Sequence, residues 1–176
     1  MRISLKASTR LIALSALTII PTLVSPGAAS ANPYVFNSSY IGAGYSAGVT
    51  SGGTPNSSAV DGGNIQGRVA IPGVPISVRG SVLFTQSNSA VIPYVTYDIP
   101  VANNVNIYTG AGYSFVQKEG QRTPIGNRDA FVVTAGAEAG ITPRIVGYGD
   151  VKWGVDAYKN SPADSLSFQA GLGYRF

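Results

Sequence analysis

The sequence contains neither cysteine nor histidine among its 176 residues. Without cysteine it has no disulfide framework, and without both residue types it cannot build a zinc finger, a haem attachment site or a thiol redox centre. Without an imidazole, nucleophile activation of the Ser-His-Asp or Cys-His type is excluded as well. The chain therefore lies outside the function classes built on these groups, and we expect it to have no cofactor and no metal site.

Charge is also scarce, since charged residues make up 11% of the chain, whereas glycine occurs 22 times and proline 11 times. An ordinary soluble surface carries more charge, and a helical protein has fewer glycines. Ten tyrosines, six phenylalanines and a hydrophobic fraction of 44% argue against disorder, because such a chain can bury apolar area. We therefore expect a folded domain whose outer surface faces something other than water.

The positive charge is concentrated at the N-terminus. Three basic residues in the first ten positions precede the apolar run 11–20 and the small residues 28–31. This order predicts a secretory signal peptide over residues 1–31, too short to span a membrane as a helix. The predicted domain, 32–176, keeps nine basic and eight acidic residues without a basic run. Nucleic acid is therefore not an expected partner, because binding it needs many phosphate contacts.

Hydrophobicity alternates with a period of two in eight segments of this domain, with apolar residues on one face and small or polar residues on the other. Pro93 interrupts the fourth segment, because proline removes a donor from the ladder. Most segments have the length of a tilted membrane-spanning strand. The predicted strands are 39–49, 64–71, 76–84, 90–99, 104–115, 130–141, 145–158 and 165–176.

The connections between these segments differ in length. The first and fifth connections, 50–63 and 116–129, are long, whereas the second, fourth and sixth are tight turns. In an up-and-down meander alternate connections lie at the same end, so one end carries loops and the other carries turns, as in outer-membrane barrels. The sequence thus predicts an all-β fold, an eight-stranded antiparallel up-and-down transmembrane β-barrel, with both termini on the periplasmic side.

A soluble barrel would show the same alternation with its apolar face turned inward. Here the face opposite the apolar one carries Gly, Ser and charges of both signs, which suit the narrow lumen of eight strands. Tyr, Phe and Trp lie on the apolar face, where they suit lipid and its interfaces. We therefore expect the apolar face to point outward.

Two sequence features carry a family resemblance. Gly-Ala-Gly-Tyr-Ser occurs at 42–46 and again at 110–114, and the last strand alternates up to a C-terminal phenylalanine. In these features the chain resembles small eight-stranded outer-membrane barrels of the OmpA/OmpX type, porin-like proteins of cyanobacteria and other Gram-negative bacteria, without a periplasmic domain. The resemblance implies location in the bacterial outer membrane and contact with its lipid. It also implies recognition by the barrel assembly machinery through Phe168, Leu172, Tyr174 and Phe176.

Four positive and four negative side chains are expected on the inward face. Because buried ions must be paired or hydrated, the equal numbers predict a salt-bridge network that fills the lumen. A gate that opens by exchange of ion-pair partners is the functional alternative. The predicted network consists of Arg68, Arg79, Asp98, Glu138, Asp150, Lys152, Asp156 and Arg175.

Two functions remain open at this stage. One is a structural or surface-interaction role through the loops 50–63 and 116–129, since loops on a rigid scaffold often carry binding. The alternative is a narrow pore for small solutes or ions. Enzymes of the outer-membrane barrel class resemble one another in their use of histidine, so catalysis is not expected. A lysine-based or carboxylate-pair mechanism is formally possible, for instance with Asp129 and Asp164 near the rim, but charged residues at loop ends are usually only solvated.

Overall fold

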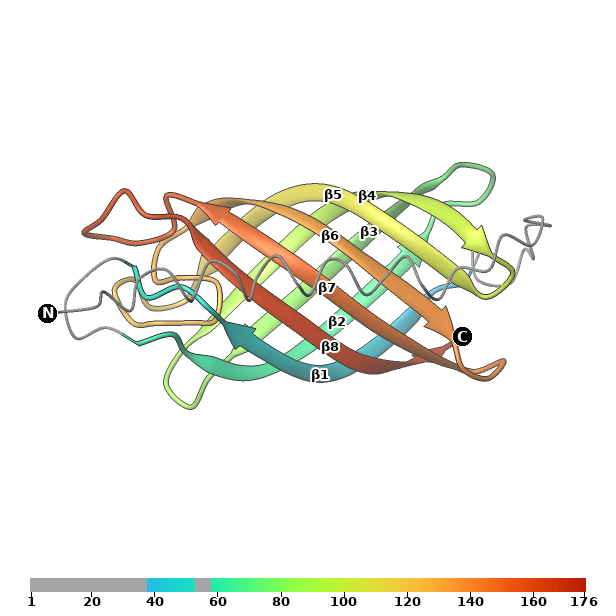
Figure 1. Ribbon diagram of the computed structural model, residues 1–176, viewed down its shortest axis with the longest axis horizontal. Helices are drawn as coiled ribbons and strands as arrows, with labels where there is room; N and C mark the ends of the chain where they lie inside the picture. Colours follow the sequence, from blue (N-terminus) through green and yellow to red (C-terminus); the bar gives the residue numbers. More distant parts are fainter. Residues whose placement is uncertain (1–37, 53–57) are drawn as a thin grey trace, which may run out of the picture.

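The computed structural model describes residues 38–52 and 58–176, and these form a closed antiparallel barrel in which β1 also pairs with β8 (Figure 1). The predicted fold class is therefore confirmed. The predicted signal peptide lies outside the described residues. The strands are β1 (Tyr40–Gly48), β2 (Asp61–Ala70), β3 (Ile76–Phe84), β4 (Ser89–Ala102), β5 (Val105–Val116), β6 (Ala130–Gly140), β7 (Ile145–Val155) and β8 (Ser165–Arg175).

The alternation in the sequence decides which way each side chain points. On β1, Tyr40 is buried in the lumen while Ile41 is 57% exposed, and on β8 Gln169 is buried while Leu172 is 59% exposed. The same alternation runs along the other strands. The apolar face is thus the outer wall and the polar face lines the lumen, as the sequence predicts.

Some strand boundaries differ from the predicted ones. β2 begins at Asp61, three residues early, because backbone pairing with β1 continues through Gly62 and Gly63 where the side chains show no pattern. β4 runs to Ala102 and contains Pro93. On the β5 side the pairing pauses between Val91 and Tyr94, where Pro93 has no N–H to donate.

The two ends of the barrel are built differently (Figure 1). The end where the C-terminus lies carries the connections 71–75, 103–104 and 141–144, and we call it the turn end. The opposite end, the loop end, carries the described residues 49–52 and 58–60, together with the connections 85–88, 117–129 and 156–164.

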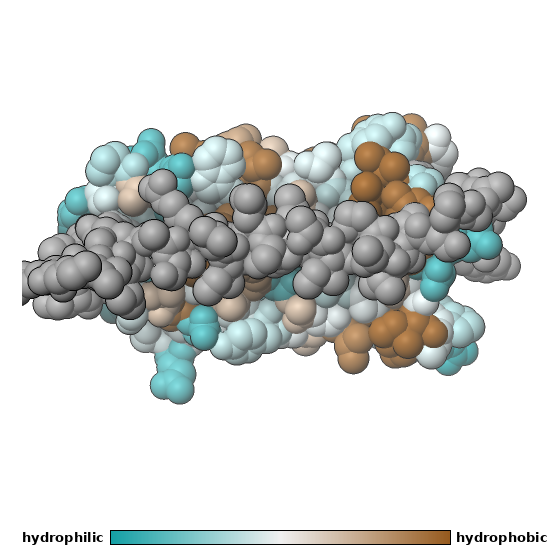
Figure 2. Space-filling view, in the orientation of Figure 1, coloured by the Kyte–Doolittle hydropathy of each residue, from teal (hydrophilic) through white to brown (hydrophobic). Residues whose placement is uncertain are grey.

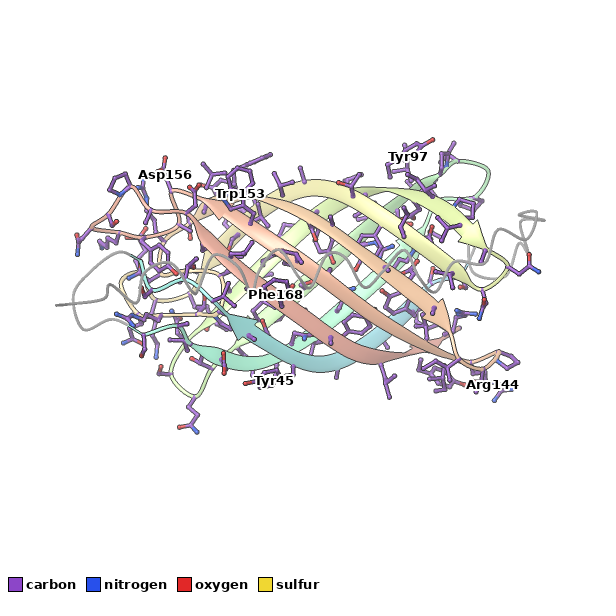
Figure 3. All side chains as sticks on the ribbon, viewed as in Figure 1. Tyr45, Tyr97, Arg144, Trp153, Asp156 and Phe168 are labelled. Atoms are coloured by element: carbon purple, nitrogen blue, oxygen red, sulfur yellow. The ribbon has the colours of Figure 1, made fainter. Side chains whose placement is uncertain are left out.

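The outer wall has the composition of a lipid-facing surface. Space-filling atoms show hydrophobic side chains on the visible wall and hydrophilic ones toward both ends (Figure 2). Trp153 lies toward the loop end and Tyr97 toward the turn end, both facing outward (Figure 3). Aromatic rings at both ends match the interfacial girdles of membrane barrels. Within the described ranges, no helix is long and apolar enough to cross a membrane.

Candidate functional site in the lumen and at the loop end

Four charged side chains from four strands meet across the lumen. Arg68 of β2 contacts Asp98 at 2.9 Å and Glu138 at 2.9 Å. Arg79 of β3 contacts the same two carboxylates, each at 3.0 Å. All four side chains are at most 1% exposed. Because Asp98 comes from β4 and Glu138 from β6, this four-charge ring ties one side of the barrel to the other.

Neutral polar groups complete the coordination of the ring. Arg79 Nη1 donates to the Tyr40 hydroxyl at 3.1 Å, and Asn106 Nδ2 donates to Glu138 at 2.9 Å. Ser77 donates a short hydrogen bond to Asp98 and accepts one from Arg68 Nε. Buried ions are stable only when their remaining donors and acceptors are satisfied, so these partners hold the ring in one arrangement.

A second ion pair lies beside the ring. Lys152 Nζ donates to Asp150 at 2.7 Å, and the Lys152 side chain is fully buried. The Tyr108 hydroxyl donates to the other oxygen of Asp150 at 2.9 Å, and the Lys152 ammonium lies 4.7 Å from the centre of the Tyr94 ring. The Arg79 guanidinium lies 3.7 Å from the centre of the Tyr108 ring. Tyr108 therefore connects the ion pair to the four-charge ring.

Two residues of the predicted network do not join it. Asp156 is exposed, because β7 ends at Val155 and Asp156 takes a positive φ of 50° in the turn that follows. The prediction that it faces the lumen is wrong. Arg175 does point inward from the end of β8 but is only half-buried, and no ion pair joins it to another described residue.

An apolar cluster that sequence reasoning missed lies inside the barrel toward the loop end. Its residues are Leu83, Ala90, Ile92, Tyr94, Val116, Ile125 and Val132. Ile125 belongs to the connection 117–129 and is 0% exposed, so this loop folds back into the barrel. The available signal was that Leu83, Ile92 and Val132 interrupt the otherwise polar inward faces of their strands. Nothing in the alternation marks Ile125, because it lies outside every strand.

Asn88 binds the connection 117–129 to the neighbouring turn 85–88. Its Nδ2 donates to the carbonyl of Lys118 at 3.0 Å and to that of Gln121 at 2.6 Å, and its Oδ1 accepts from Lys118 N at 3.0 Å. The side chain is 5% exposed. We call the three connections 85–88, 117–129 and 156–164 together the cap.

Within the cap, the connection 156–164 is hydrogen-bonded to the connection 117–129. The carbonyl of Ala157 accepts from Asn127 N at 3.0 Å, and Lys159 N donates to Asn127 Oδ1 at 2.9 Å. Tyr158 packs inward and donates to the Thr50 carbonyl at 2.8 Å, and burial raises the pKa of its hydroxyl. The connections 85–88, 117–129 and 156–164 therefore form one hydrogen-bonded layer.

The two carboxylates near the rim have structural partners. Asp129 accepts from the backbone N of Val116 at 2.7 Å, and Asp164 accepts from that of Asp156 at 3.0 Å. Both thus fix loop ends. In 38–52 and 58–176, no three acidic side chains gather in a way that could hold a metal ion.

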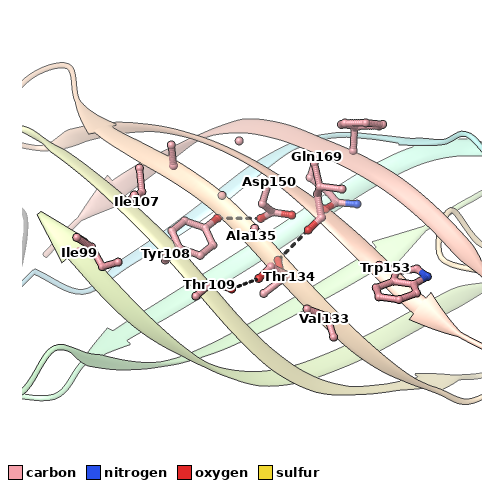
Figure 4. Close-up of a pocket in the computed structure, with 15 residues that line it drawn as sticks. Ile99, Ile107, Tyr108, Thr109, Val133, Thr134, Ala135, Asp150, Trp153 and Gln169 are labelled. Carbon is pink, nitrogen blue, oxygen red and sulfur yellow. Dashed lines mark hydrogen bonds between the residues drawn. The ribbon is translucent and has the colours of Figure 1, made fainter. Parts of the chain in front are cut away.

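The outer wall carries a depression of about 820 Å³ between β4 and β8 (Figure 4). Its lining includes the outward residues Ile107, Val133, Ala135, Trp153 and Phe168.

The four residues of the predicted assembly signal also belong to the outer wall near β8. Phe168 is half-buried, Leu172 and Tyr174 are exposed, and Phe176 is 75% exposed.

Comparison with known proteins defines the class of this fold. No sequence-family profile and no curated protein matches the chain. Among solved structures it is similar to the N-terminal β-barrel domain of Pseudomonas aeruginosa OprF, with a TM-score of 0.56, 11% identity, and coverage of 80% of this chain and 98% of that one. Neisserial surface protein A gives a TM-score of 0.56 at 18% identity, covering 78% and 97%.

A third similar structure is the Yersinia pestis outer membrane protein Ail in a phospholipid bilayer nanodisc. Its TM-score is 0.52 at 17% identity, with coverage of 80% of this chain and 99% of that one. The chain therefore has the fold of the small outer-membrane β-barrels, with an apolar wall suited to membrane lipid. At these identities the similarity concerns the fold, and function must be argued from the lumen and the cap.

Proposed function

We propose that this chain is a closed outer-membrane barrel whose role is structural or surface-interacting and is carried by the cap. The observation that carries the proposal is the pair of barriers in series along the lumen. The four-charge ring crosses the lumen, and the apolar cluster with Ile125 lies inside the barrel toward the loop end. An eight-stranded lumen filled by side chains leaves no continuous water path.

The cap is a prearranged surface. Its loops are bound to each other by Asn88 and Asn127, while Lys118, Glu119, Arg128 and Lys159 remain exposed. A rigid loop surface binds a partner with less loss of conformational entropy than mobile loops do. The name of Neisserial surface protein A indicates a surface location for one barrel of this shape, in keeping with this proposal.

A narrow pore is the second candidate. The polar lining of the lumen favours it, because the ring and the Asp150–Lys152 ion pair would face water if the cap moved away. Recording from the refolded protein in planar bilayers distinguishes the two. We expect no steady conductance, and a steady ion current from single molecules would favour the pore.

The surface role needs its own test. In cells that express the barrel, Lys118, Glu119, Arg128 and Lys159 are replaced together by serine, which leaves the backbone hydrogen bonds of Asn88 in place. We expect changed attachment of these cells to a panel of immobilised proteins and polysaccharides. Arg144→Ser, at the turn end, is the matched control and should attach like the unmodified barrel. Equal attachment by all strains, including one without the barrel, would contradict the interaction role.

A further inference from the structure

The described lumen contains one more positive than negative side chain. Asp98 and Glu138 each contact two arginines, and Asp150 contacts Lys152. Because Asp156 lies outside the barrel, no described inward carboxylate remains for Arg175. Charge inside a narrow lumen is stable only when it is paired or hydrated, so the half-buried Arg175 must take water or an anion from outside the described residues.

The Arg175 guanidinium lies across the mouth of the turn end. Arg175 pairs with Tyr40 on β1, and its side chain reaches Gly140 on β6, where a Cβ would stand 3.0 Å from Nη2. Although the residue is half-buried, its Nε and Nη2 are buried and have no hydrogen-bond partner in the described part of the chain. Two donors of one cation at this mouth therefore lack a hydrogen-bond partner among the described residues.

A hydroxyl two residues before β1 also lacks a hydrogen-bond partner in the ranges 38–52 and 58–176. Ser38 Oγ is buried and unpartnered within the described residues. The Ser38 carbonyl accepts from Arg68 Nη1 at 3.3 Å, and Phe176 N donates to the Ser39 carbonyl at 3.1 Å. These bonds fix Ser38 at the mouth beside the last residues of β8. A serine hydroxyl can donate to an anion, as the two guanidinium nitrogens can.

We propose that a small monovalent anion binds at the turn-end mouth, held by Arg175 Nε and Nη2 with Ser38 Oγ as a further donor. One surplus positive charge calls for one negative charge. Glu138 is the inward residue next to Gly140 on β6, and its carboxylate disfavours an anion of higher charge. The site rests on the lumen geometry and is independent of the role proposed for the cap.

Chloride is the probe for this site. The refolded protein in uncharged detergent is titrated with sodium chloride against sodium gluconate at constant ionic strength, and the ³⁵Cl line width is measured. We expect saturable broadening for the unmodified protein, complete loss for Arg175→Gln, and weakening for Ser38→Ala. Arg144→Gln removes an exposed arginine from the same end and should leave the broadening unchanged.

The thermal unfolding midpoint gives an independent reading, because a ligand that binds only the folded state raises it. Chloride should raise the midpoint of the unmodified protein and of Arg144→Gln but not that of Arg175→Gln. No saturable broadening in the unmodified protein, or equal broadening in Arg175→Gln, would overturn the site. If Arg175→Gln fails to refold, unchanged broadening in Ser38→Ala would overturn the proposed geometry. Displacement of chloride by phosphate at equal or lower concentration would overturn the restriction to a monovalent anion.

Discussion

Asp150 and Lys152 stand two positions apart on β7, so the strand directs both side chains into the lumen. Asp150→Ala would leave the buried ammonium of Lys152 without its carboxylate. Removing one partner of a buried ion pair destabilises a protein by about 3 kcal/mol when the other stays dry. We expect the urea midpoint of the refolded protein to fall accordingly.

The matched control is the ion pair between Lys159 and Glu119, whose side chains are half exposed at a distance of 3.0 Å. Glu119→Ala should change the unfolding free energy by about 1 kcal/mol or less. The double variant Asp150→Ala/Lys152→Met should recover part of the loss, since it removes the unpaired charge. Equal urea midpoints for Asp150→Ala and the unmodified protein would refute a dry, paired Lys152.

Residue by residue, alternation predicted which side chains point inward but not which of them pair. Arg68 and Glu138 are 70 positions apart in the chain, and their contact depends on how all the strands between them are staggered. Alternation also fails where a strand ends. Asp156 continues the pattern of β7 in the sequence, but the backbone turns at that residue, so the pattern no longer describes its direction.

At the scale of strands, glycines allow β1 and β8 to close the barrel. Gly44 faces Gly171 in register, and a Cβ at Gly44 would collide with the backbone of Ala170 and Gly171. Gly44→Ala should therefore destabilise the refolded barrel by about 1–3 kcal/mol, the range typical of overpacking.

Gly67 provides the comparison for the same substitution. It lies on β2, and no heavy atom would come within 4 Å of a Cβ there. Gly67→Ala should leave the urea midpoint unchanged or slightly higher, because alanine restricts the unfolded chain. The role of Gly44 in closure would be rejected if both alanine variants unfolded at the same urea concentration.

The side chain of Asn88 makes three of the hydrogen bonds that hold the cap together. Asn88→Ala removes three hydrogen bonds to the connection 117–129, each worth about 1 kcal/mol. We expect trypsin to cleave the refolded protein after Lys118 about tenfold faster or more, with the barrel itself left intact. In the control variant Asn160→Ala, which changes an exposed position of another loop, trypsin should cleave after Lys118 at the same rate as in the unmodified protein. If trypsin cleaved Asn88→Ala no faster than the unmodified protein, contacts other than those of Asn88 would hold the cap.

Across the whole molecule, the sequence predicted the number of strands, their order and the two unlike ends, because each depends on local alternation and connection length. The cap could not be predicted in this way. Its contacts join residues of separate loops, such as Asn88 with Gln121 and Asn127 with Lys159, and no periodic pattern marks such pairs.

Insertion into the outer membrane of cells involves the whole molecule, and deletion of Phe176 tests whether this residue is needed for it. Its side chain points outward, and its backbone N donates to the Ser39 carbonyl at 3.1 Å. Deleting it removes an interfacial ring but no lumen contact. We therefore expect a chain without Phe176 to fold in detergent yet to accumulate poorly in the outer membrane of cells. Phe115→Ala removes an exposed phenylalanine elsewhere and should insert normally. Normal insertion of the shortened chain would refute the assembly role.

The orientation of the barrel in the membrane follows from its unlike ends. An even number of strands leaves both ends of the barrel domain on the side from which the chain is inserted, so the cap should face outward. Lys118, Arg128 and Lys159 are exposed at the loop end. Arg144 is also exposed, at the turn end (Figure 3). Since exposure alone does not separate these sites, their cleavage by trypsin reports which side of the membrane each occupies.

Trypsin added to intact cells should cut after the loop-end residues and spare Arg144. The refolded protein in detergent is the positive control, because both ends are then accessible and Arg144 should be cut as well. Cleavage after Arg144 in intact cells, with the loop-end sites untouched, would place the turns outside. It would also remove the basis for a surface role of the cap, because the cap would then face the periplasm.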